Sequence, residues 1–247
     1  MIKEGFIACG VRYNYKLNRA EHFLASSFNE YAPSMGSKYI QSYTLDAFRA
    51  INLNNRNIIT GTPCQIDSFR HYIKKFRKEE NFVLVDFFCH GVPSKFLWDK
   101  YLENVKKKTG TPLRVYWRSK KNGWHNSYNI VVEGVEGHYS SKKACFDPFY
   151  ACFLGDCCLN KACYDNCKFK YTNSSADIRI GDMWGNLYSK EERGVTTIIT
   201  FTKKGEDVIK NTNCTLIPSS IKELITRSIV SLLRLEPIIC LLVSTSL

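Results

Sequence analysis

The chain has 247 residues, of which 44% are hydrophobic, 13% aromatic and 23% charged. These proportions are typical of a folded globular protein and exclude a disordered chain, a collagen and a long coiled coil. Lys and Arg total 35 against 23 Asp and Glu, and the formal net charge of +12 suits an anionic partner. The cations gather largely on polar faces and ends of predicted helices, and no nucleic-acid-binding signature accompanies them. We therefore expect no specific nucleic-acid target.

The chain ends and the 11 cysteines bear on the cellular compartment. The N-terminus has no long apolar stretch or cleavage site of a secretory signal. The uncharged run 237–247 is shorter than the ~20 residues that span a bilayer. We expect a cytoplasmic protein without a transmembrane segment, in which clustered cysteines are metal or cluster ligands rather than disulfides.

Hydrophobic periodicity predicts strands over 5–15 and 22–28 and a short helix over 45–51. A buried strand over 57–60 precedes a helix whose apolar residues recur at three- and four-residue spacing, and a strand over 82–88 precedes a second such helix around 96–105. Further strands are predicted over 113–117, 128–133, 178–181 and 196–201. The fold class is therefore α/β, a mixed, partly parallel sheet with flanking helices and a cysteine-rich loop near 145–167. We expect a single domain over residues 1–247.

Two successive strand–turn–helix units imply parallel strands, whose carboxyl ends form the ligand-binding edge of such sheets. Both turns carry a cysteine: Cys64 lies near a predicted helix N-terminus, which favours a thiolate, and Cys89 leaves the next strand. Each cysteine alone could instead be a small buried apolar residue. Together they make two thiols that could face one crevice.

The cysteine-rich loop holds the pair Cys157 and Cys158, followed by Cys163 and Cys167, with Cys145 and Cys152 upstream. A short loop with several thiols can bind zinc or an iron–sulfur cluster, and the spacing alone does not choose between them. Unligated loop thiols are the alternative. An iron–sulfur cluster is favoured if Cys64 and Cys89 complete the ligand set.

These motifs occur in an order that resembles one protein family. The segments that carry the resemblance are Gly36-Ser37-Lys38-Tyr39-Ile40-Gln41-Ser42, Gly61-Thr62-Pro63-Cys64-Gln65, Asp86 with Cys89-His90-Gly91-Val92-Pro93-Ser94, Trp98 with Tyr101-Leu102, Arg118 with Lys120 and Gly123-Trp124, Cys163-Tyr164 with Cys167, and Asp177-Ile178 with Gly181-Asp182-Met183-Trp184-Gly185. In this order they are similar to the coenzyme F420 hydrogenase/dehydrogenase beta-subunit family, over about residues 5–210. The remaining residues, 211–247, diverge.

The resemblance implies an oxidoreductase domain that passes electrons between a 4Fe-4S cluster, FAD and an organic acceptor, either the deazaflavin coenzyme F420 or another small molecule. It implies Cys64, Cys89, Cys163 and Cys167 as cluster ligands, with Cys158 in reserve. FAD would contact Gly36, Ser37, Lys38, Tyr39, Gln41, Gly61, Thr62, Gln65, Asp182 and Trp184, with Lys38 as counter-charge to the pyrophosphate.

His90 is a weak candidate proton donor, because a histidine in a turn is more often structural or exposed. Lys38, Asp182 and Trp184 each have a plainer interpretation too, as a surface cation, a turn cap and a core aromatic. The sequence alone assigns no catalytic residue.

The chain also departs from the family pattern. The ferredoxin-like segment that commonly precedes this domain does not occur before residue 5 here. We expect either that a ferredoxin-like or other electron-donor protein supplies it as a partner, or that the chain is a truncated or split product. The spacing between Cys163 and Cys167 is one residue wider than usual, which keeps Cys158 in reserve. Two other functions stay open: a redox-inactive accessory or binding protein with a structural metal site, and a basic zinc-containing nucleic-acid-binding module.

Overall fold

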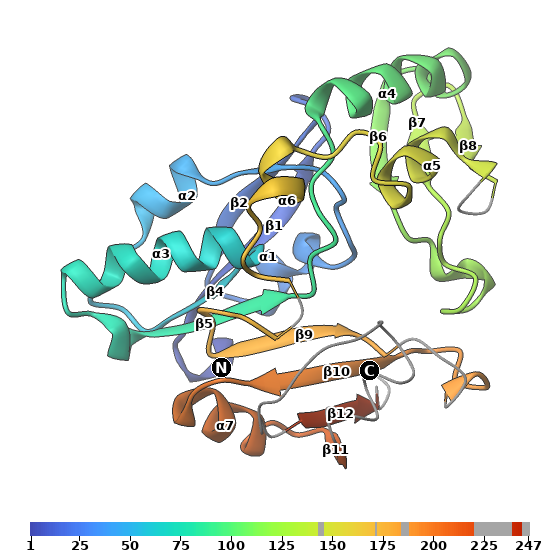
Figure 1. Cartoon of the computed structure of the whole chain (residues 1–247). Helices are drawn as coiled ribbons and strands as arrows, with labels where there is room; N and C mark the ends of the chain where they lie inside the picture. Colours follow the sequence, from blue (N-terminus) through green and yellow to red (C-terminus); the bar gives the residue numbers. More distant parts are fainter. Residues whose placement is uncertain (143–145, 171, 184–187, 220–238, 244–247) are drawn as a thin grey trace. The chain divides into compact units, whose positions relative to one another are not determined.

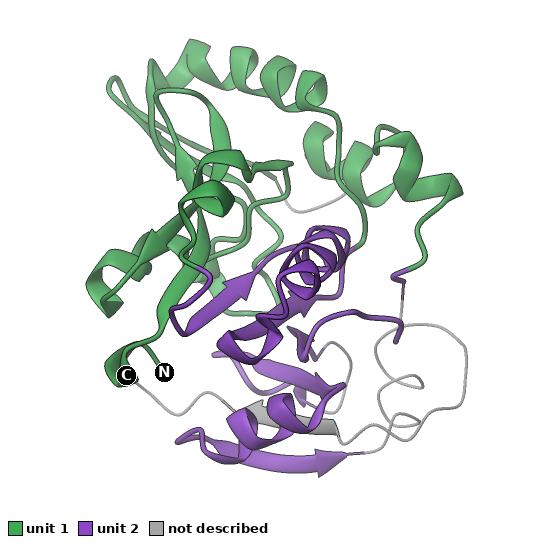
Figure 2. Ribbon diagram, turned by 90° about the vertical axis from the view of Figure 1, so that its left-hand side faces the viewer, with its two compact units in different colours: residues 1–52, 90–168 green, residues 53–89, 169–247 purple. Residues whose placement is uncertain are grey.

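The structure is a computed structural model that describes residues 1–142, 146–170, 172–183, 188–219 and 239–243, without the side chains of the last range. The described residues form two compact units (Figures 1 and 2). Unit 1 comprises residues 1–52 and 90–168, and unit 2 comprises residues 53–89 and 169–247. Because the chain crosses between them three times, neither unit is one continuous segment. The prediction of a single domain stays a prediction.

Unit 2 is built on a mixed sheet with strand order β11-β12-β10-β9-β5-β4. The strand β5 runs parallel to both β4 and β9, whereas β9, β10, β12 and β11 pair with one another antiparallel. The strands are β4 (Asn57–Thr60), β5 (Phe82–Phe87), β9 (Ile178–Asp182), β10 (Val195–Thr200), β11 (Thr215–Ser219) and β12 (Ile239–Val243). The partly parallel sheet confirms the predicted fold class.

Two helices of unit 2 follow strands of this sheet: α3 (Pro63–Lys75) after β4 and α7 (Lys203–Lys210) after β10. The apolar stripe of α3 buries Ile66, Phe69 and Ile73, as the three- and four-residue spacing predicts. A short 3-10 turn (Glu79–Asn81) then leads into β5, whose first five residues are buried. This strand–helix–strand unit is the part of the fold that the sequence predicts most closely.

Buried charges join the parallel strands β5 and β9. The guanidinium of Arg179 donates to both carboxylate oxygens of Asp86, at 2.7 and 2.6 Å, and both side chains are fully buried. Ser174 donates a further hydrogen bond to Asp86. Asp177 accepts from the Leu84 amide and from Arg70 of α3. Two acidic residues of the family-like pattern, Asp86 and Asp177, therefore hold the sheet together, because a buried carboxylate needs such partners.

Unit 1 contains two groups of paired strands. The hairpin of β1 (Ile7–Asn14) and β2 (Arg19–Ala25) is antiparallel and is extended by the two-residue strand β3 (Ser42–Tyr43). The second sheet has the antiparallel order β6-β7-β8, with β6 (Pro112–Tyr116), β7 (Val131–Gly134) and β8 (His138–Ser140). The helices of unit 1 are α1 (Phe28–Tyr31), α2 (Leu45–Ala50), α4 (Lys95–Thr109), α5 (Pro148–Leu154) and α6 (Lys161–Asp165). Its 3-10 turns lie at Ile2–Glu4, Ala32–Ser34 and Lys120–Asn122.

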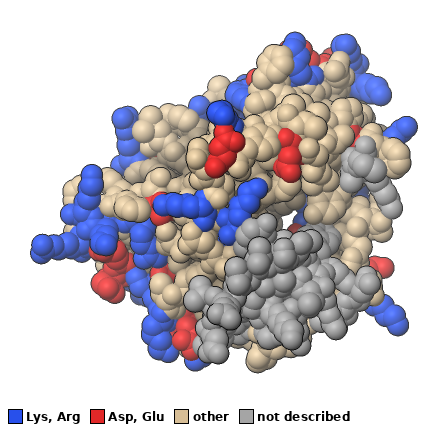
Figure 3. All heavy atoms as spheres, in the orientation of Figure 1, with Lys and Arg blue, Asp and Glu red and all other residues tan. Residues whose placement is uncertain are grey.

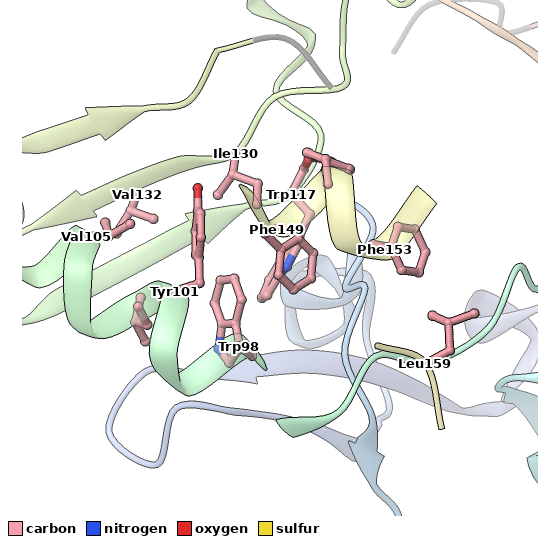
Figure 4. Packing of buried hydrophobic residues seen from close by; sticks show 11 residues of the cluster. Trp98, Tyr101, Val105, Trp117, Ile130, Val132, Phe149, Phe153 and Leu159 are labelled. Carbon is pink, nitrogen blue, oxygen red and sulfur yellow. Dashed lines mark hydrogen bonds between the residues drawn. The ribbon is translucent and has the colours of Figure 1, made fainter. Parts of the chain in front are cut away.

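The core of unit 1 is an aromatic cluster between α4, α5 and the sheet β6-β7-β8 (Figure 4). Trp98 of α4 stacks beside Tyr101 and lies 4.8 Å, centroid to centroid, from Trp117. Phe149 and Phe153 of α5 extend the cluster. Such rings bury large apolar areas, so the cluster fixes α4 and α5 on the sheet.

The segment predicted as a cysteine-rich loop is in fact partly helical. Asp147 caps the N-terminus of α5 by accepting from the amides of Phe149 and Tyr150, and Pro148 occupies the first helical position. Asn160 caps α6 in the same way. The predicted cysteine-rich loop therefore contains two short helices, each begun by a capping residue.

No helix in the described ranges is long and apolar enough to cross a membrane.

Candidate functional site

Three parallel strands of unit 2 end at one edge of the sheet. Thr60 of β4 pairs with Val85 of β5, and Phe87 of β5 pairs with Ile180 of β9. The carboxyl ends of these three strands therefore lie side by side at one edge of the sheet. The segments 61–65 and 88–89 follow β4 and β5, the segment 181–183 ends β9, and all three contain predicted site residues. The expectation that the two cysteine-bearing turns share one sheet edge is confirmed, and the end of β9 joins them.

The first segment, Gly61 to Gln65, forms the N-terminus of α3. Thr62 and Gln65 make a capping box, in which the Thr62 amide donates to the Gln65 side chain at 3.0 Å. Pro63 suits the first helical turn. Cys64 is exposed there, with its sulfur 3.2 Å from the Thr62 hydroxyl oxygen. The helix dipole at this position favours a negative ligand.

The second and third segments meet through a glycine. Phe88 follows β5, its amide donates to the Ile180 carbonyl, and its ring lies against Gly181 at the end of β9. A Cβ at Gly181 would lie 2.4 Å from the Phe88 ring, so any larger residue would have to displace that ring. Cys89 is the next residue and is half-buried. Asp182 ends β9, and Trp184 lies outside the described residues.

In unit 1 the predicted cofactor loop from Gly36 to Gln41 is organised by Lys38. The Lys38 ammonium donates to the backbone carbonyls of Pro33, Ser34, Met35 and Gly36 at 2.7–3.3 Å. Burial lowers the pKa of Lys38 to about 8, which leaves the amine mostly protonated at neutral pH. Because an ammonium has three N–H donors, four carbonyls occupy all of them. A phosphate at Lys38 would therefore have to displace part of this ring of carbonyls.

The rest of that loop lies partly on the core of unit 1. Gly36 has φ +83° with open space around its Cα, so its glycine is required by the backbone conformation. Tyr39 stacks on Phe153 at 4.9 Å between ring centroids. Ser37 is half-buried, whereas Gln41 is exposed. The structure thus explains Gly36, Lys38 and Tyr39 as determinants of the loop conformation, and leaves their contacts with FAD a prediction.

His90 is anchored to the end of α5. Its Nε2 atom lies 3.0 Å from the Phe153 carbonyl oxygen and 3.0 Å from an Asp156 carboxylate oxygen. Both oxygens are acceptors, so Nε2 must carry the proton. These contacts give His90 a structural role in the described state, and its role as proton donor stays a prediction.

The chain after His90 runs beside the cysteine segment. The Ser94 amide donates to the Cys158 carbonyl, and the Asn160 amide donates to the Val92 carbonyl. Gly91 lies so close to Leu159 that a Cβ would be 2.6 Å from its side chain. The Cys-His-Gly-Val-Pro-Ser motif thereby positions the segment 157–160, which carries Cys157 and Cys158.

Three cysteines come together in this segment. Burial, and then the neighbouring thiol of Cys158, raise the pKa of the Cys152 thiol on α5. The Cys157 amide donates to the Cys152 carbonyl at 3.0 Å. The contact between Cys152 and Cys158 is one that the sequence did not lead us to expect. The sequence signal for this contact is that Cys152 and Cys158 are six residues apart, one before and one after the end of α5.

The two other predicted ligands in unit 1 lie on and after α6. Cys163 packs against the aromatic cluster, and Cys167 follows the end of the helix. The neighbouring Tyr164 hydroxyl accepts from the Leu159 amide and donates to the Asp156 carbonyl, so this tyrosine fixes the turn that carries Cys157 and Cys158.

The four predicted cluster ligands therefore fall two in each unit: Cys64 and Cys89 in unit 2, Cys163 and Cys167 in unit 1. Cys64, Cys163 and Cys167 form no disulfide, and none of the four is fully buried. Accessible thiols suit ligation of iron or zinc. Within the part of the chain that the structure describes, no group of three His, Cys, Asp or Glu side chains has the arrangement of a metal site.

Comparisons with known proteins bear on this site. A family defined by the C-terminal part of the beta subunit of coenzyme F420 hydrogenase/dehydrogenase matches residues 54–216. Among solved structures, a chain of the F420-reducing nickel–iron hydrogenase complex from Methanosarcina barkeri superposes with a TM-score of 0.54 at 16% identity, covering 85% of this chain and 67% of that one. At this identity the likeness shows the fold alone. A search of curated protein sequences gave no match.

The family match spans well over half of the chain. It includes the turns of Cys64 and Cys89, the cysteine-rich segment 157–167 and the Gly181-Asp182 end of β9. The chain therefore belongs to the coenzyme F420 hydrogenase/dehydrogenase beta-subunit family of oxidoreductases.

Proposed function

We propose that this chain is an iron–sulfur flavoprotein domain that passes electrons between a 4Fe-4S cluster, FAD and an organic acceptor. The observation that carries the proposal is the convergence of Cys64, Cys89 and Asp182 at the carboxyl edge of the parallel strands, within the region that matches the family. This edge is the usual ligand site of α/β sheets.

The thiolates of Cys64, Cys89, Cys163 and Cys167 would hold the cluster, with Cys158 in reserve. Cysteine thiolates are the ligands that 4Fe-4S clusters require, and the cluster supplies one-electron transfer when bound. Cys64 is suited to this role because it is exposed at the N-terminus of α3, where the helix dipole favours a negatively charged group. The Thr62 hydroxyl beside that sulfur can donate a further hydrogen bond to a thiolate.

FAD supplies two-electron chemistry when bound. The N-terminus of α3 with Gly61, Thr62 and Gln65, and the loop with Gly36, Ser37, Tyr39 and Gln41, are the segments proposed to hold it, with Asp182 and Trp184. Lys38 is proposed to act first by fixing the loop through its backbone carbonyls. It reaches a phosphate only if some of those carbonyls are released.

The acceptor is proposed to be coenzyme F420 or another small molecule, and the donor a ferredoxin-like or other electron-carrier protein. The solved relative is part of a hydrogenase complex, which supports the expectation of a protein partner. The net charge of +12 favours acidic or phosphate-bearing partners.

The test is the iron content of cysteine variants purified anaerobically as the full chain. Cys64→Ser and Cys167→Ser are expected to lose most of the bound iron, because a cluster with three thiolates is labile. The matched controls are Cys214→Ser, a half-buried cysteine between α7 and β11, and Cys157→Ser, an exposed cysteine beside the proposed ligands.

Thermal melts of all four variants establish that they are folded. Iron contents that are equal in the ligand variants and the controls would refute the ligand assignment. A wild-type chain that binds zinc and no flavin would instead support the accessory or nucleic-acid-binding alternative.

A further inference from the structure

The C-terminal end of α3 in unit 2 carries exposed aromatic and basic side chains together. Tyr72 is 44% exposed and Phe76 is 52% exposed, and their rings contact each other edge-on with centroids 5.1 Å apart. Lys74, Lys75 and Arg77 are exposed beside them. We call these five residues the basic aromatic patch. In Figure 3 blue Lys and Arg side chains gather over this end of α3.

The plain explanation of the cations is the helix dipole, since positive side chains stabilise a helix C-terminus. That explanation covers Lys74 and Lys75. It does not cover two aromatic rings left in water at positions i and i+4, where polar side chains would serve the helix equally well. The described hydrogen bonds and ion pairs include none made by the side chains of Lys74, Lys75 or Arg77.

The backbone at Arg77 is a second and independent observation. The amides of Arg77 and Lys78 donate to the carbonyls of Lys74 and Ile73, which is the Schellman arrangement that ends a helix. This arrangement needs a left-handed residue, and Arg77 has φ +52° where glycine is the usual choice. An arginine in a strained, exposed position indicates that its side chain has a use.

The shape of the patch distinguishes among anionic partners. The five residues come from one helix end and its cap, and Tyr72, Lys75 and Phe76 share one side of it at three- and four-residue spacing. A stable protein interface takes about 20–30 residues a side, far more than the patch offers. A lipid surface needs no matching shape, only aromatic rings at the headgroup level and cations that reach anionic lipids.

We propose that the basic aromatic patch binds reversibly to the surface of an anionic lipid bilayer, with Tyr72 and Phe76 in the headgroup region and Lys74, Lys75 and Arg77 on lipid phosphates. The patch acts without a membrane-spanning helix, as a peripheral contact whose strength falls with ionic strength. This inference is independent of the proposed redox function.

The experiment measures co-sedimentation of the full chain with phosphatidylcholine vesicles that contain or lack phosphatidylglycerol. The double variant Lys74→Gln with Lys75→Gln is compared with Lys107→Gln with Lys108→Gln. Both pairs lie in the last turn of a helix and change the net charge equally, and the second pair lies on α4. Each cation near an anionic surface contributes roughly fivefold, so the patch pair should weaken partitioning about 25-fold while the α4 pair does not.

The aromatic contribution is measured separately. Tyr72→Ser with Phe76→Ser leaves the charge unchanged and should also weaken partitioning, and Phe76→Trp should show blue-shifted fluorescence on adding the anionic vesicles. Circular dichroism melts of each variant exclude unfolding as the cause.

Three results would overturn the proposal: no binding to anionic vesicles at low salt, equal losses in the two lysine pairs, or aromatic variants that bind as the wild type does. Patch-dependent binding that is tighter to a short duplex DNA or to poly-glutamate than to vesicles would also overturn it. That outcome would assign the patch to a nucleic acid or to an acidic protein.

Discussion

Single residues of the family-like motifs have steric and electrostatic reasons that the structure makes visible. Gly181 is a glycine because the Phe88 ring occupies the space of a Cβ, Gly36 because of its positive φ, and Gly91 because of a positive φ together with the nearby Leu159 side chain. His90 and Lys38 use their polar atoms on nearby backbone carbonyls. None of these contacts could be predicted from one sequence, because each depends on a partner distant in the chain or on the path of a loop.

The first prediction concerns Gly181. Gly181→Ala should destabilise unit 2 by about 1–3 kcal/mol, because the new methyl group would lie 2.4 Å from the Phe88 ring. Gly61→Ala is the control: there a Cβ would lie 3.2 Å from the movable Gln65 side chain, and the cost should be smaller. Urea unfolding of both variants measures the difference. Equal stabilities would show that Phe88 can move aside.

The second prediction concerns the pH dependence of the Asp147 cap. Burial raises the pKa of Asp147 above its ordinary value, against the opposing effect of its hydrogen bonds with Tyr150, Tyr101 and Phe149. Between the unfolded and folded pKa values the folded state then binds more protons, so the stability contribution falls as pH rises.

Asp147→Asn removes this titration while keeping a side-chain oxygen for the cap. The unfolding free energy of the wild type relative to Asp147→Asn should therefore decline from about pH 4 upward. A difference that grows with pH would mean that the hydrogen-bond donors stabilise the carboxylate more than burial destabilises it.

At the scale of elements, strands and helices with a strong apolar period were predicted closely. The strand Asn57–Thr60 and the helix Pro63–Lys75 follow the expected pattern, because their buried residues keep one face throughout. The helices α5 and α6 were missed, since each is short and is set by its cap and by packing on the aromatic cluster rather than by a long periodic pattern. Short elements depend more on tertiary contacts than on propensity.

The third prediction concerns the end of α3. Arg77→Gly should stabilise the chain by about 0.5–1 kcal/mol, because glycine adopts the left-handed cap without the steric cost that arginine bears. Arg77→Ala removes the same cation but keeps that cost, so it should not raise the melting temperature. Differential scanning calorimetry compares the two. A stabilisation by alanine equal to that by glycine would point to charge repulsion rather than backbone strain.

At the scale of the whole molecule, the sequence predicted the fold class and the family but not the division into two interleaved units. The strand–turn–helix pattern indicates a parallel sheet, and it does not reveal that residues 90–168 fold with the N-terminal segment instead. The proposed cluster ligands accordingly belong to both units, Cys64 and Cys89 to one and Cys163 and Cys167 to the other.

The most direct test of that proposal is the cofactor content of the full chain purified without oxygen. Iron, acid-labile sulfide and flavin should be found together, with about four iron and four sulfide per chain and one flavin, and with the brown colour of an iron–sulfur flavoprotein. A colourless protein that contains zinc or no metal, and that takes up neither cluster nor FAD on reconstitution, would contradict it.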